Sequence, residues 1–306
     1  MVSAEPEYID LELLGRPGVV GTVVLRTDRG FWLVDPGPSS ALDGLRRGLA
    51  SLGGSLADVC GLLLTHIHLD HAGASGTIVA EHPGVRVFVH RRGAPHVIDP
   101  SRLLQSAGQL YGDKMAYLWG DVAPVPAAQV QILDGGEVLD LDGRAVEVAY
   151  TPGHASHHVS YFDRETASVF AGDTGGVFLA AAPQVVIPPT PPPDVDPDAW
   201  SASLTLIRQW HPQRLYVTHF GGTTDPETHL DSLERQLHRM SEWVRETLGE
   251  PGTDQQRAAR FVARMHADLR RRASEEAIGQ YDAAVPLDHC WYGLARYWKR
   301  NVRSAQ

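Results

Sequence analysis

Four side chains of metal-binding types lie within six residues of one another, directly after an apolar run that suits a buried strand. Residues 62–73 read LLLTHIHLDHAG. Residues two apart do not share a helix face, so His66 and His68 can converge only where the chain is extended or turning. Asp70 and His71 then lie where the chain enters the next predicted helix. The segment can therefore offer one pair of ligands to one metal ion and the second pair to another.

Three further candidate ligands follow predicted strands later in the chain. His154 stands in Thr-Pro-Gly-His, Asp173 in Gly-Asp-Thr-Gly-Gly and His219 in Thr-His-Phe-Gly-Gly. The neighbouring glycines allow the backbone to approach a site closely. Together with the first four, these residues make five imidazoles and two carboxylates. Two ions that share one carboxylate would each have four protein ligands, with room for a water between them.

The pattern of apolar residues predicts an α/β body followed by helices alone. Short runs rich in β-branched and aromatic residues indicate strands at 8–14, 19–25, 31–34, 60–64, 85–89, 145–150, 159–162, 169–171 and 215–217. Helical patterns lie between them at 40–52, 73–81, 101–118 and 198–210. After residue 225 the sequence predicts only helices, at 226–248, 254–279 and 287–300. We therefore expect a catalytic domain over 1–225 and a helical extension packed on it over 226–306.

The charge of the chain argues against long polyanionic partners. The 306 residues include 27 Lys and Arg against 37 Asp and Glu, and 43% are hydrophobic, enough for a sizeable core. Residues 226–306 hold 13 basic and 12 acidic residues, which leaves 14 against 25 in residues 1–225. A body this acidic lacks the basic track that nucleic acid requires. No apolar run approaches the ~18 residues of a membrane span, so we expect neither nucleic acid nor membrane as a partner.

The expected compartment is the cytoplasm. Residues 1–7, MVSAEPE, are acidic and lack the basic and apolar regions of an export signal. The two cysteines, Cys60 and Cys290, could form one disulfide at most, and reduced thiols are the simpler interpretation. The sequence leaves open whether the chain forms a homodimer.

The order and spacing of the candidate ligands resemble those of the metallo-β-lactamase superfamily. The resemblance is carried by His-Ile-His-Leu-Asp-His at 66–71, followed by Thr-Pro-Gly-His, Gly-Asp-Thr and Thr-His at the three later strand ends. It extends over about residues 8–222 and leaves out the helical extension. It implies a four-layer αββα sandwich, of the α/β (α+β) class, with the metal ions at one edge of the sheets.

The resemblance also implies a role for each candidate. The implied ligands are His66, His68 and His154 for the first ion, Asp70, His71 and His219 for the second, and Asp173 as the bridge between them. Asp35, in the run LVDPG, corresponds to an early aspartate that supports a ligand imidazole. A turn aspartate before Pro-Gly explains Asp35 equally well. His158, four residues after the third ligand, is expected to pack against the site or support it, not to bind metal.

The implied activity is hydrolysis by a water that bridges two divalent ions, for which zinc is favoured and manganese or iron stay open. Asp70 is expected to carry the proton to the leaving group. Asp173 is a carboxylate that true β-lactamases with this ligand set usually lack, and Gly176 stands where the best-known lactonases have a tyrosine. The basic cluster by which glyoxalase II binds glutathione is not found. We therefore expect a small-molecule substrate that is an ester, a lactone or a thioester.

Two other activities within the superfamily stay open. A mononuclear iron sulfur dioxygenase, which oxidises persulfides, would use only His66, His154 and Asp173. The presence of the other four ligands argues against it. A hydrolase that processes nucleic acids or other phosphodiesters is disfavoured by the acidic body.

Residues 101–119 fall between predicted strands and form the candidate substrate cover. Tyr111, Tyr117 and Trp119 are the residues expected to face a substrate, because an aromatic cover suits an acyl chain or a ring. A helix buried against the body or against a dimer partner accounts for the same pattern equally well. The C-terminal helices are the other candidate for the cover, although their aromatic residues are interpreted as packing.

Overall fold

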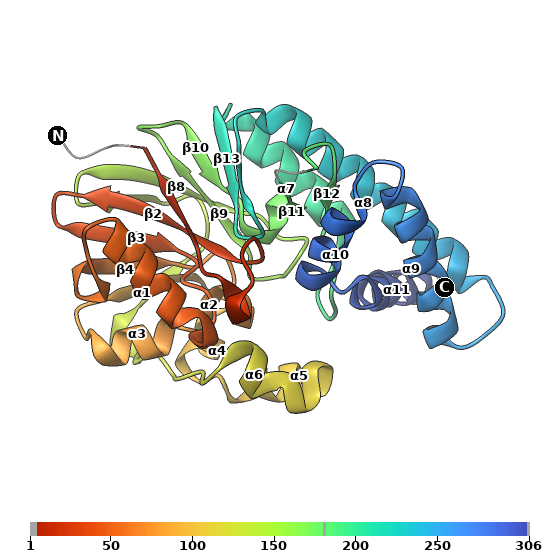
Figure 1. Cartoon of the computed structure of the whole chain (residues 1–306), viewed down its shortest axis with the longest axis horizontal. Coiled ribbons are helices and arrows are strands. Elements are labelled where there is room, and N and C mark those ends of the chain that lie inside the picture. Colours follow the sequence, from red (N-terminus) through yellow and green to blue (C-terminus); the bar gives the residue numbers. More distant parts are fainter. Residues whose placement is uncertain (1–4, 180–181, 305–306) are drawn as a thin grey trace.

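The computed structural model describes residues 5–179 and 182–304. Two six-stranded sheets stacked on one another form the centre of the molecule (Figure 1). The first sheet has the strands in chain order: β1 (Glu7–Asp10), β2 (Gly21–Thr27), β3 (Gly30–Val34), β4 (Val59–Leu63), β5 (Arg86–His90) and β6 (Val130–Leu133). The second has the order β14-β13-β10-β9-β8-β7, with β7 (Val138–Leu141), β8 (Arg144–Tyr150), β9 (Val159–Asp163), β10 (Ser168–Phe170), β13 (Arg214–Val217) and β14 (Gly221–Thr223). Both sheets are mixed, since β3 to β6 run parallel in the first and β10 and β13 in the second.

Alternate residues of the central strands enter different apolar cores, as strands buried on both faces require. In β3, Trp32 and Val34 lie in the core between the two sheets, whereas Leu33 lies in the core beneath the helices of the first sheet. In β10, Phe170 lies between the sheets and Val169 lies in the core beneath the helices of the second sheet. This alternation produces three cores and therefore four layers.

Helices cover the outer face of each sheet. The first sheet is covered by α1 (Leu42–Ser51) and α3 (Ser75–Glu81), and the second by α7 (Pro197–Gln209) and α8 (Pro226–Leu248). Leu45 and Ile78 belong to the core of the first sheet, and Leu204 and Leu230 to that of the second. The arrangement confirms the predicted four-layer αββα sandwich.

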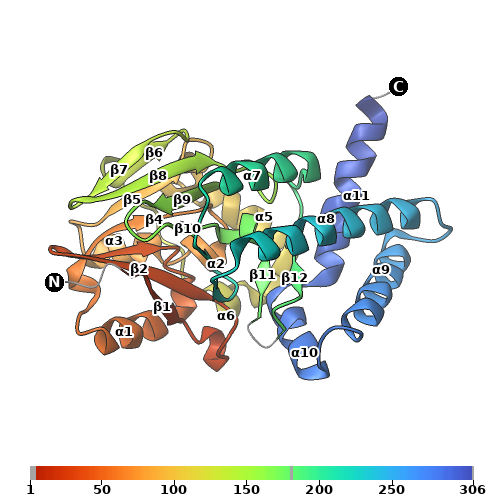
Figure 2. The same cartoon turned by 90° about the horizontal axis from the view of Figure 1, so that it is seen from above.

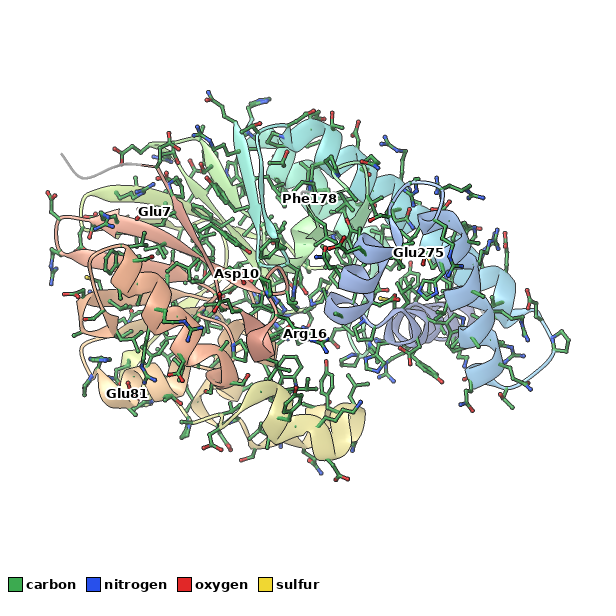
Figure 3. The ribbon with its side chains drawn as sticks, in the orientation of Figure 1. Glu7, Asp10, Arg16, Glu81, Phe178 and Glu275 are labelled. Carbon is green, nitrogen blue, oxygen red and sulfur yellow. The ribbon has the colours of Figure 1, made fainter. Side chains whose placement is uncertain are left out.

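The C-terminal helices share a core with a short hairpin of the sandwich. From the second sheet, α8 extends toward α9 (Asp254–Leu269), α10 (Glu275–Ala284) and α11 (Leu287–Ser304) (Figure 2). The hairpin consists of β11 (Val177–Phe178) and β12 (Val186–Ile187). Val177 and Ile187 pack with Phe261, Tyr281 and Trp291 of these helices. Phe178, labelled in Figure 3, packs instead in the core of the second sheet. The hairpin therefore joins the helices to the sandwich.

Two predicted helices are each divided in the structure. The helix predicted over 101–118 consists of α5 (Ser101–Tyr111) and α6 (Met115–Trp119), because Gly112 has a φ of 52° and ends α5. The helix predicted over 254–279 consists of α9 and α10, because the Ser274 hydroxyl accepts a hydrogen bond from the N–H of Ala277 and caps a new helix. The strand predicted over 8–14 ends at Asp10 and is followed by a 3-10 turn over Leu13–Gly15.

The two strands at neighbouring sheet edges, β6 and β7, were not predicted. Ile132 and Val138 are 49% and 51% exposed, so their apolar side chains do not follow the in-and-out alternation that marks a strand. The short helix α4 (Ala94–Ile98) was also missed, since five residues are too few for a helical period to show.

In the ranges that the structure describes, no helix is long and apolar enough to cross a membrane. Cys60 and Cys290 are both free. Residues 1–4, on which the expectation of no export signal partly rests, lie outside the described residues, as do residues 305 and 306 at the end of the predicted extension.

We predict that Trp291→Ala destabilises the chain strongly. The indole is fully buried among the C-terminal helices, and its N–H donates to the Thr247 hydroxyl at 2.8 Å. Its removal should lower the free energy of unfolding by about 3–5 kcal/mol. Tyr292→Ala, which truncates the adjacent aromatic residue, 37% exposed, should cost about 1 kcal/mol or less. Chemical denaturation measures both, and equal losses would show that α11 is not part of the core.

Candidate metal centre

Seven side chains converge at one end of the sandwich, where strands of both sheets end. They are His66 and His68 after β4, Asp70 and His71 in α2 (Leu69–Ala72), His154 after β8, Asp173 in the 3-10 turn after β10, and His219 after β13. Their ligand atoms form three overlapping groups, and within each group these atoms all lie within 4.8 Å of one another. The structure thus brings together every residue that the sequence indicated as a metal ligand.

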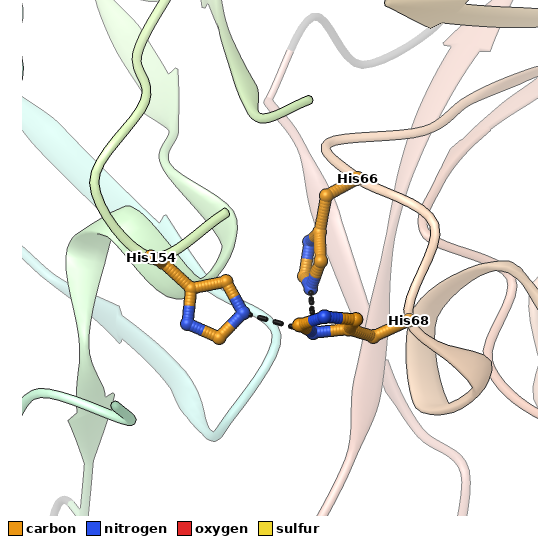
Figure 4. A group of neighbouring side chains, drawn as sticks. All are labelled: His66, His68 and His154. Atoms are coloured by element: carbon orange, nitrogen blue, oxygen red, sulfur yellow. Dashed lines mark hydrogen bonds between the residues drawn. The ribbon is translucent and has the colours of Figure 1, made fainter. Parts of the chain in front are cut away.

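Three imidazoles form the first group (Figure 4). Nε2 of His66 and Nε2 of His154 lie 3.0 and 2.9 Å from Nδ1 of His68. Ligand atoms of a tetrahedral zinc site lie about 3.3 Å apart, because zinc–nitrogen distances are ~2.0–2.1 Å. The three nitrogens therefore have nearly the spacing of three ligands to one ion.

Asp70, His71 and His219 form the second group, and Asp173 lies between the two groups. Nε2 of His219 is 3.1 Å from Oδ2 of Asp70. Oδ1 of Asp173 lies 3.2 Å from Nε2 of His71, and its Oδ2 lies 3.4 Å from Nε2 of His154. The two oxygens of Asp173 are thus directed toward different groups.

Hydrogen bonds on the outer side of two imidazoles fix which nitrogen faces the centre. Nδ1 of His154 donates to the carbonyl of Pro189 at 2.8 Å, and Nδ1 of His219 donates to the carbonyl of Val19 at 2.8 Å. A carbonyl oxygen only accepts, so Nδ1 of each ring carries the proton. Nε2 of His154 therefore presents a lone pair to the first group, whereas Nε2 of His219 lies 3.1 Å from the Asp70 carboxylate and can donate to it when the ring is charged.

The carboxylate of Asp35 is the outer partner of the other rings. It is fully buried and accepts four hydrogen bonds: from the backbone N–H and hydroxyl of Thr65 at 2.8 and 2.7 Å, from Nδ1 of His71 at 2.8 Å, and from the Thr218 hydroxyl at 2.8 Å. The Thr65 hydroxyl uses its one hydrogen to donate to Asp35, so its oxygen accepts from Nδ1 of His66 at 3.0 Å. Asp35 thus orients two imidazoles, one directly and one through Thr65.

These outer bonds leave the first group with more lone pairs than protons. Nδ1 of His68 faces the Nε2 lone pairs of both His66 and His154, and one proton on it does not satisfy both. Nε2 of His71 and Oδ1 of Asp173 are buried and make no hydrogen bond within the described residues. An unpartnered buried polar atom costs about 1–3 kcal/mol, and a cation would satisfy all of these atoms. Imidazole and carboxylate donors suit zinc, manganese or iron, so the residues present fit divalent metal ions.

The two groups differ in the direction of their pKa shifts. Burial lowers the pKa of His66 and of His154, and it lowers the pKa of His68 to about 4. Burial also opposes a charge on His71 and His219, but the carboxylates around them outweigh it and raise the pKa of both rings. The first group is therefore neutral and open to a cation, whereas a cation in the second group would replace protons.

The His158 ring packs behind the first group. It is fully buried, and its centroid lies 5.1 Å from that of His66. Its Nε2 accepts from the N–H of Thr174 at 3.3 Å, and its Nδ1 lies 3.0 Å from the Thr151 hydroxyl. A Cβ atom at Gly172, whose φ is 49°, would lie 2.8 Å from this ring. Both nitrogens of His158 are therefore engaged away from the centre.

A cavity of about 360 Å³ opens over the centre. Its wall includes Asp70 together with Tyr111 and Trp119 from the predicted cover. Tyr117 is not in this wall, and its side chain is 65% exposed. Residues two apart lie on opposite faces of a helix, so α6 turns Tyr117 to solvent when Trp119 faces the cavity. The expectation that Tyr117 faces a substrate is corrected accordingly.

Three residues near the centre were not predicted from the sequence. His157 lines the cavity and is only 9% exposed, with a buried Nδ1 that has no hydrogen-bond partner among the described residues. No signal in the sequence pointed to His157, because its position directly before His158 matches no ligand spacing. Thr65 and Thr218 did carry a signal, because each directly precedes a ligand histidine at a strand end. Their shared contact with Asp35 explains the repeated Thr-His pair.

The fold and the centre define a protein of the class of two-sheet sandwiches with a metal-binding edge. The sequence model of the metallo-beta-lactamase superfamily matches residues 15–219. The chain belongs to the metallo-beta-lactamase superfamily, which confirms the resemblance in the order of the ligands.

Individual relatives are distant. The metallo-beta-lactamase fold-containing protein ST1585 of Sulfurisphaera tokodaii is 28% identical over 182 residues, 58% of this chain and 66% of that protein. A crystal structure of ST1585 from Sulfolobus tokodaii has a TM-score of 0.63 at 25% identity, covering 78% of this chain and 86% of that one. A hydroxyacylglutathione hydrolase of Synechococcus is 28% identical over 126 residues, 41% of this chain and 37% of that enzyme. The structure of TTHA1623 in a di-iron-bound form has a TM-score of 0.51 at 27% identity, covering 68% and 93%. The matched region thus spans less than two thirds of the length of both curated relatives.

We predict that Asp35→Asn weakens metal binding while the fold is retained. The amide keeps the size of the side chain but replaces one acceptor oxygen with a donor, so a hydroxyl or imidazole partner loses its acceptor. Affinity for divalent ions should fall about 10–100-fold, as measured by competition with a chromophoric chelator. Asp43→Asn is the matched control, because this carboxylate on α1 is 83% exposed. An affinity equal to that of the control would show that the ligand rings need no support from Asp35.

Proposed function

We propose that the protein is a hydrolase that uses two divalent metal ions to cleave a small ester, lactone or thioester. The observation that carries the proposal is the convergence of seven imidazole and carboxylate side chains, five of which line one cavity, with buried inward atoms that make no hydrogen bond within the described residues. A buried cluster of this kind is costly unless cations occupy it. The cavity, about 360 Å³, is of a size for a small molecule.

Each ion would have its own set of ligands. The proposed sets are His66, His68 and His154 for one ion and Asp70, His71 and His219 for the other, with Asp173 shared. The direction of the two Asp173 oxygens toward different groups supports the shared role. The imidazole-rich donor set favours zinc, and manganese or iron are the alternatives.

Bound divalent ions would supply hydroxide near neutral pH and would polarise a carbonyl oxygen. The side chains of the protein would position the substrate and transfer a proton to its leaving group. The Asp70 side chain is 22% exposed and lines the cavity, whereas Asp173 is 5% exposed. Asp70 is therefore the carboxylate of the centre that can take up a proton and pass it to a leaving group.

A carbonyl substrate is favoured over a phosphodiester. The acidic first 225 residues would repel a polyanion. Among the relatives, the hydroxyacylglutathione hydrolase of Synechococcus is named for the hydrolysis of an acylated substrate. Gly176 offers no phenol to the reaction, and a Cβ atom there would lie 2.7 Å from Leu233, so this position supplies no side chain that could stabilise a developing oxyanion.

The number of ions per chain separates this proposal from a mononuclear iron dioxygenase. Such an enzyme would need only three of the ligands, whereas His68, Asp70, His71 and His219 also lie at the centre. Metal analysis of the purified chain after loading with zinc, manganese or iron should give about two ions per chain. One iron per chain with oxygen uptake on a persulfide would support the alternative.

We predict metal-dependent hydrolysis of at least one of a lactone, an aryl ester and a thioester by the loaded protein. His68→Ala should lower kcat/KM by more than about 100-fold, because even outer partners of metal ligands contribute 10–100-fold. His238→Ala is the control, since this histidine is exposed on α8. Absence of turnover on all three substrates with two ions bound, or an equal effect of both substitutions, would contradict the proposal.

A further inference from the structure

The helix α5 is unusual because it has no buried residue along its 11 positions. Four of its apolar residues are nevertheless placed on one side. Leu103, Ala107, Leu110 and Tyr111 recur every three or four residues and line the cavity, with Arg102 and Ser106 beside them. An amphipathic helix normally buries such a stripe against the protein. In α5 the stripe faces the cavity, and only Leu103 among these residues also packs against the core of the first sheet.

The opposite wall comes from the C-terminal helices. Residues at the turn between α10 and α11 line the cavity, namely Ala284, Val285, Pro286, His289 and Cys290. Prolines of the segment 189–193 complete this wall. The rings of Tyr111 and His289 approach to 6.1 Å between centroids and join the two walls. In Figure 1, α5 and α6 form the arm at the lower edge, and α10 and α11 lie beside it.

The space between these walls is continuous with the metal centre. His68, Asp70, Asp173 and His219 line the same cavity as the stripe of α5. From Leu103 to Leu110 the helix rises by about 10 Å, the length of a medium-chain acyl group. A substrate whose carbonyl lies at the centre would therefore have an apolar channel for the group attached to it.

We propose that this channel binds the acyl part of the substrate, so that the enzyme acts on esters, lactones or thioesters with an extended apolar acyl chain and not on compact polar ones. The proposal rests on the proposed hydrolytic function and specifies its substrate class. The hydrophobic effect supplies the selectivity, since each methylene that leaves water gains about 0.8 kcal/mol when fully buried. The acyl chain of the substrate would lie between the stripe of α5 and residues 284–290.

The test is a series of aryl esters from acetate to octanoate, with the metal-loaded protein. The value of kcat/KM should rise about two- to fourfold for each added methylene until the channel is filled. Ala107→Trp places a large ring in the channel, so it should lower the ratio of kcat/KM for octanoate to that for acetate and flatten the dependence on chain length. Gln105→Trp is the matched control, because Gln105 is exposed on the same helix and does not line the cavity.

A second variant tests the channel without added volume. Leu110→Ser removes apolar surface from the stripe and should flatten the dependence on chain length. Neither position is buried, so unfolding midpoints should match that of the original protein. Metal-dependent turnover that is equal for acetate and octanoate would overturn the channel while leaving the hydrolytic function intact. Absence of metal-dependent turnover on every ester, lactone and thioester would overturn the hydrolytic function itself.

A second copy of the chain is the competing occupant of the stripe. If α5 covered itself by pairing with another copy, light scattering would give a dimer, and Ala107→Trp would convert it to a monomer with no change in chain-length preference. That result would overturn the proposal. A shift in chain-length preference with an unchanged molar mass supports it.

Discussion

The buried carboxylate of Asp35 is the contact on which the arrangement of the centre depends. A charged group at full burial costs several kcal/mol unless its lone pairs are matched, and four donors match it here. Thr65 follows a strand of the first sheet and Thr218 a strand of the second. The carboxylate therefore ties the two sheets together at the edge where the ligands meet. The backbone of Asp35 has a φ of 54°, which aspartate tolerates. The N–H of Asp35 donates to the carbonyl of Leu63.

This support orients the ligand rings before any cation arrives. Carbonyl groups of Pro189 and Val19 hold two of the rings from behind, and Asp35 holds two others. The cost appears in the first group, where three nitrogens face one another with too few protons, and at Nε2 of His71 and Oδ1 of Asp173, which make no hydrogen bond within the described residues. The residues of both groups would hold a cation, and a cation there would satisfy these atoms and link loops of both sheets. Binding and stability should therefore be coupled in this protein.

Much of the fold and of the metal centre could be predicted from local patterns in the sequence. The meeting of the seven candidate ligands could be predicted because four stand in one segment directly after an apolar run and three stand beside glycine or threonine at the ends of later runs. Strand ends of a sandwich meet at one edge. The apolar runs predicted an α/β body, and the resemblance carried by the candidate ligands implied its four layers. Tyr117 could not be placed correctly, because its orientation depends on where α5 ends at Gly112. The edge strands β6 and β7 were missed since exposed Ile132 and Val138 break the alternation. The orientation of Tyr117 and the pairing of the edge strands depend on tertiary contacts, which the local sequence does not show.

The two walls of the cavity differ in how firmly the rest of the molecule holds them. On α11, Leu287, Cys290 and Trp291 are buried at positions three or four apart, so this wall is fixed by the same core that holds the C-terminal helices to the hairpin. The helix α5 has no buried residue, so a small shift of it breaks few apolar contacts. In the proposed enzyme, the firmly held wall and the candidate ligands would set where a substrate carbonyl lies, while α5 would follow the shape of what is attached to that carbonyl. The C-terminal helices would belong to the functional site in this sense, because together with the prolines of 189–193 they supply the firmly held wall of the cavity.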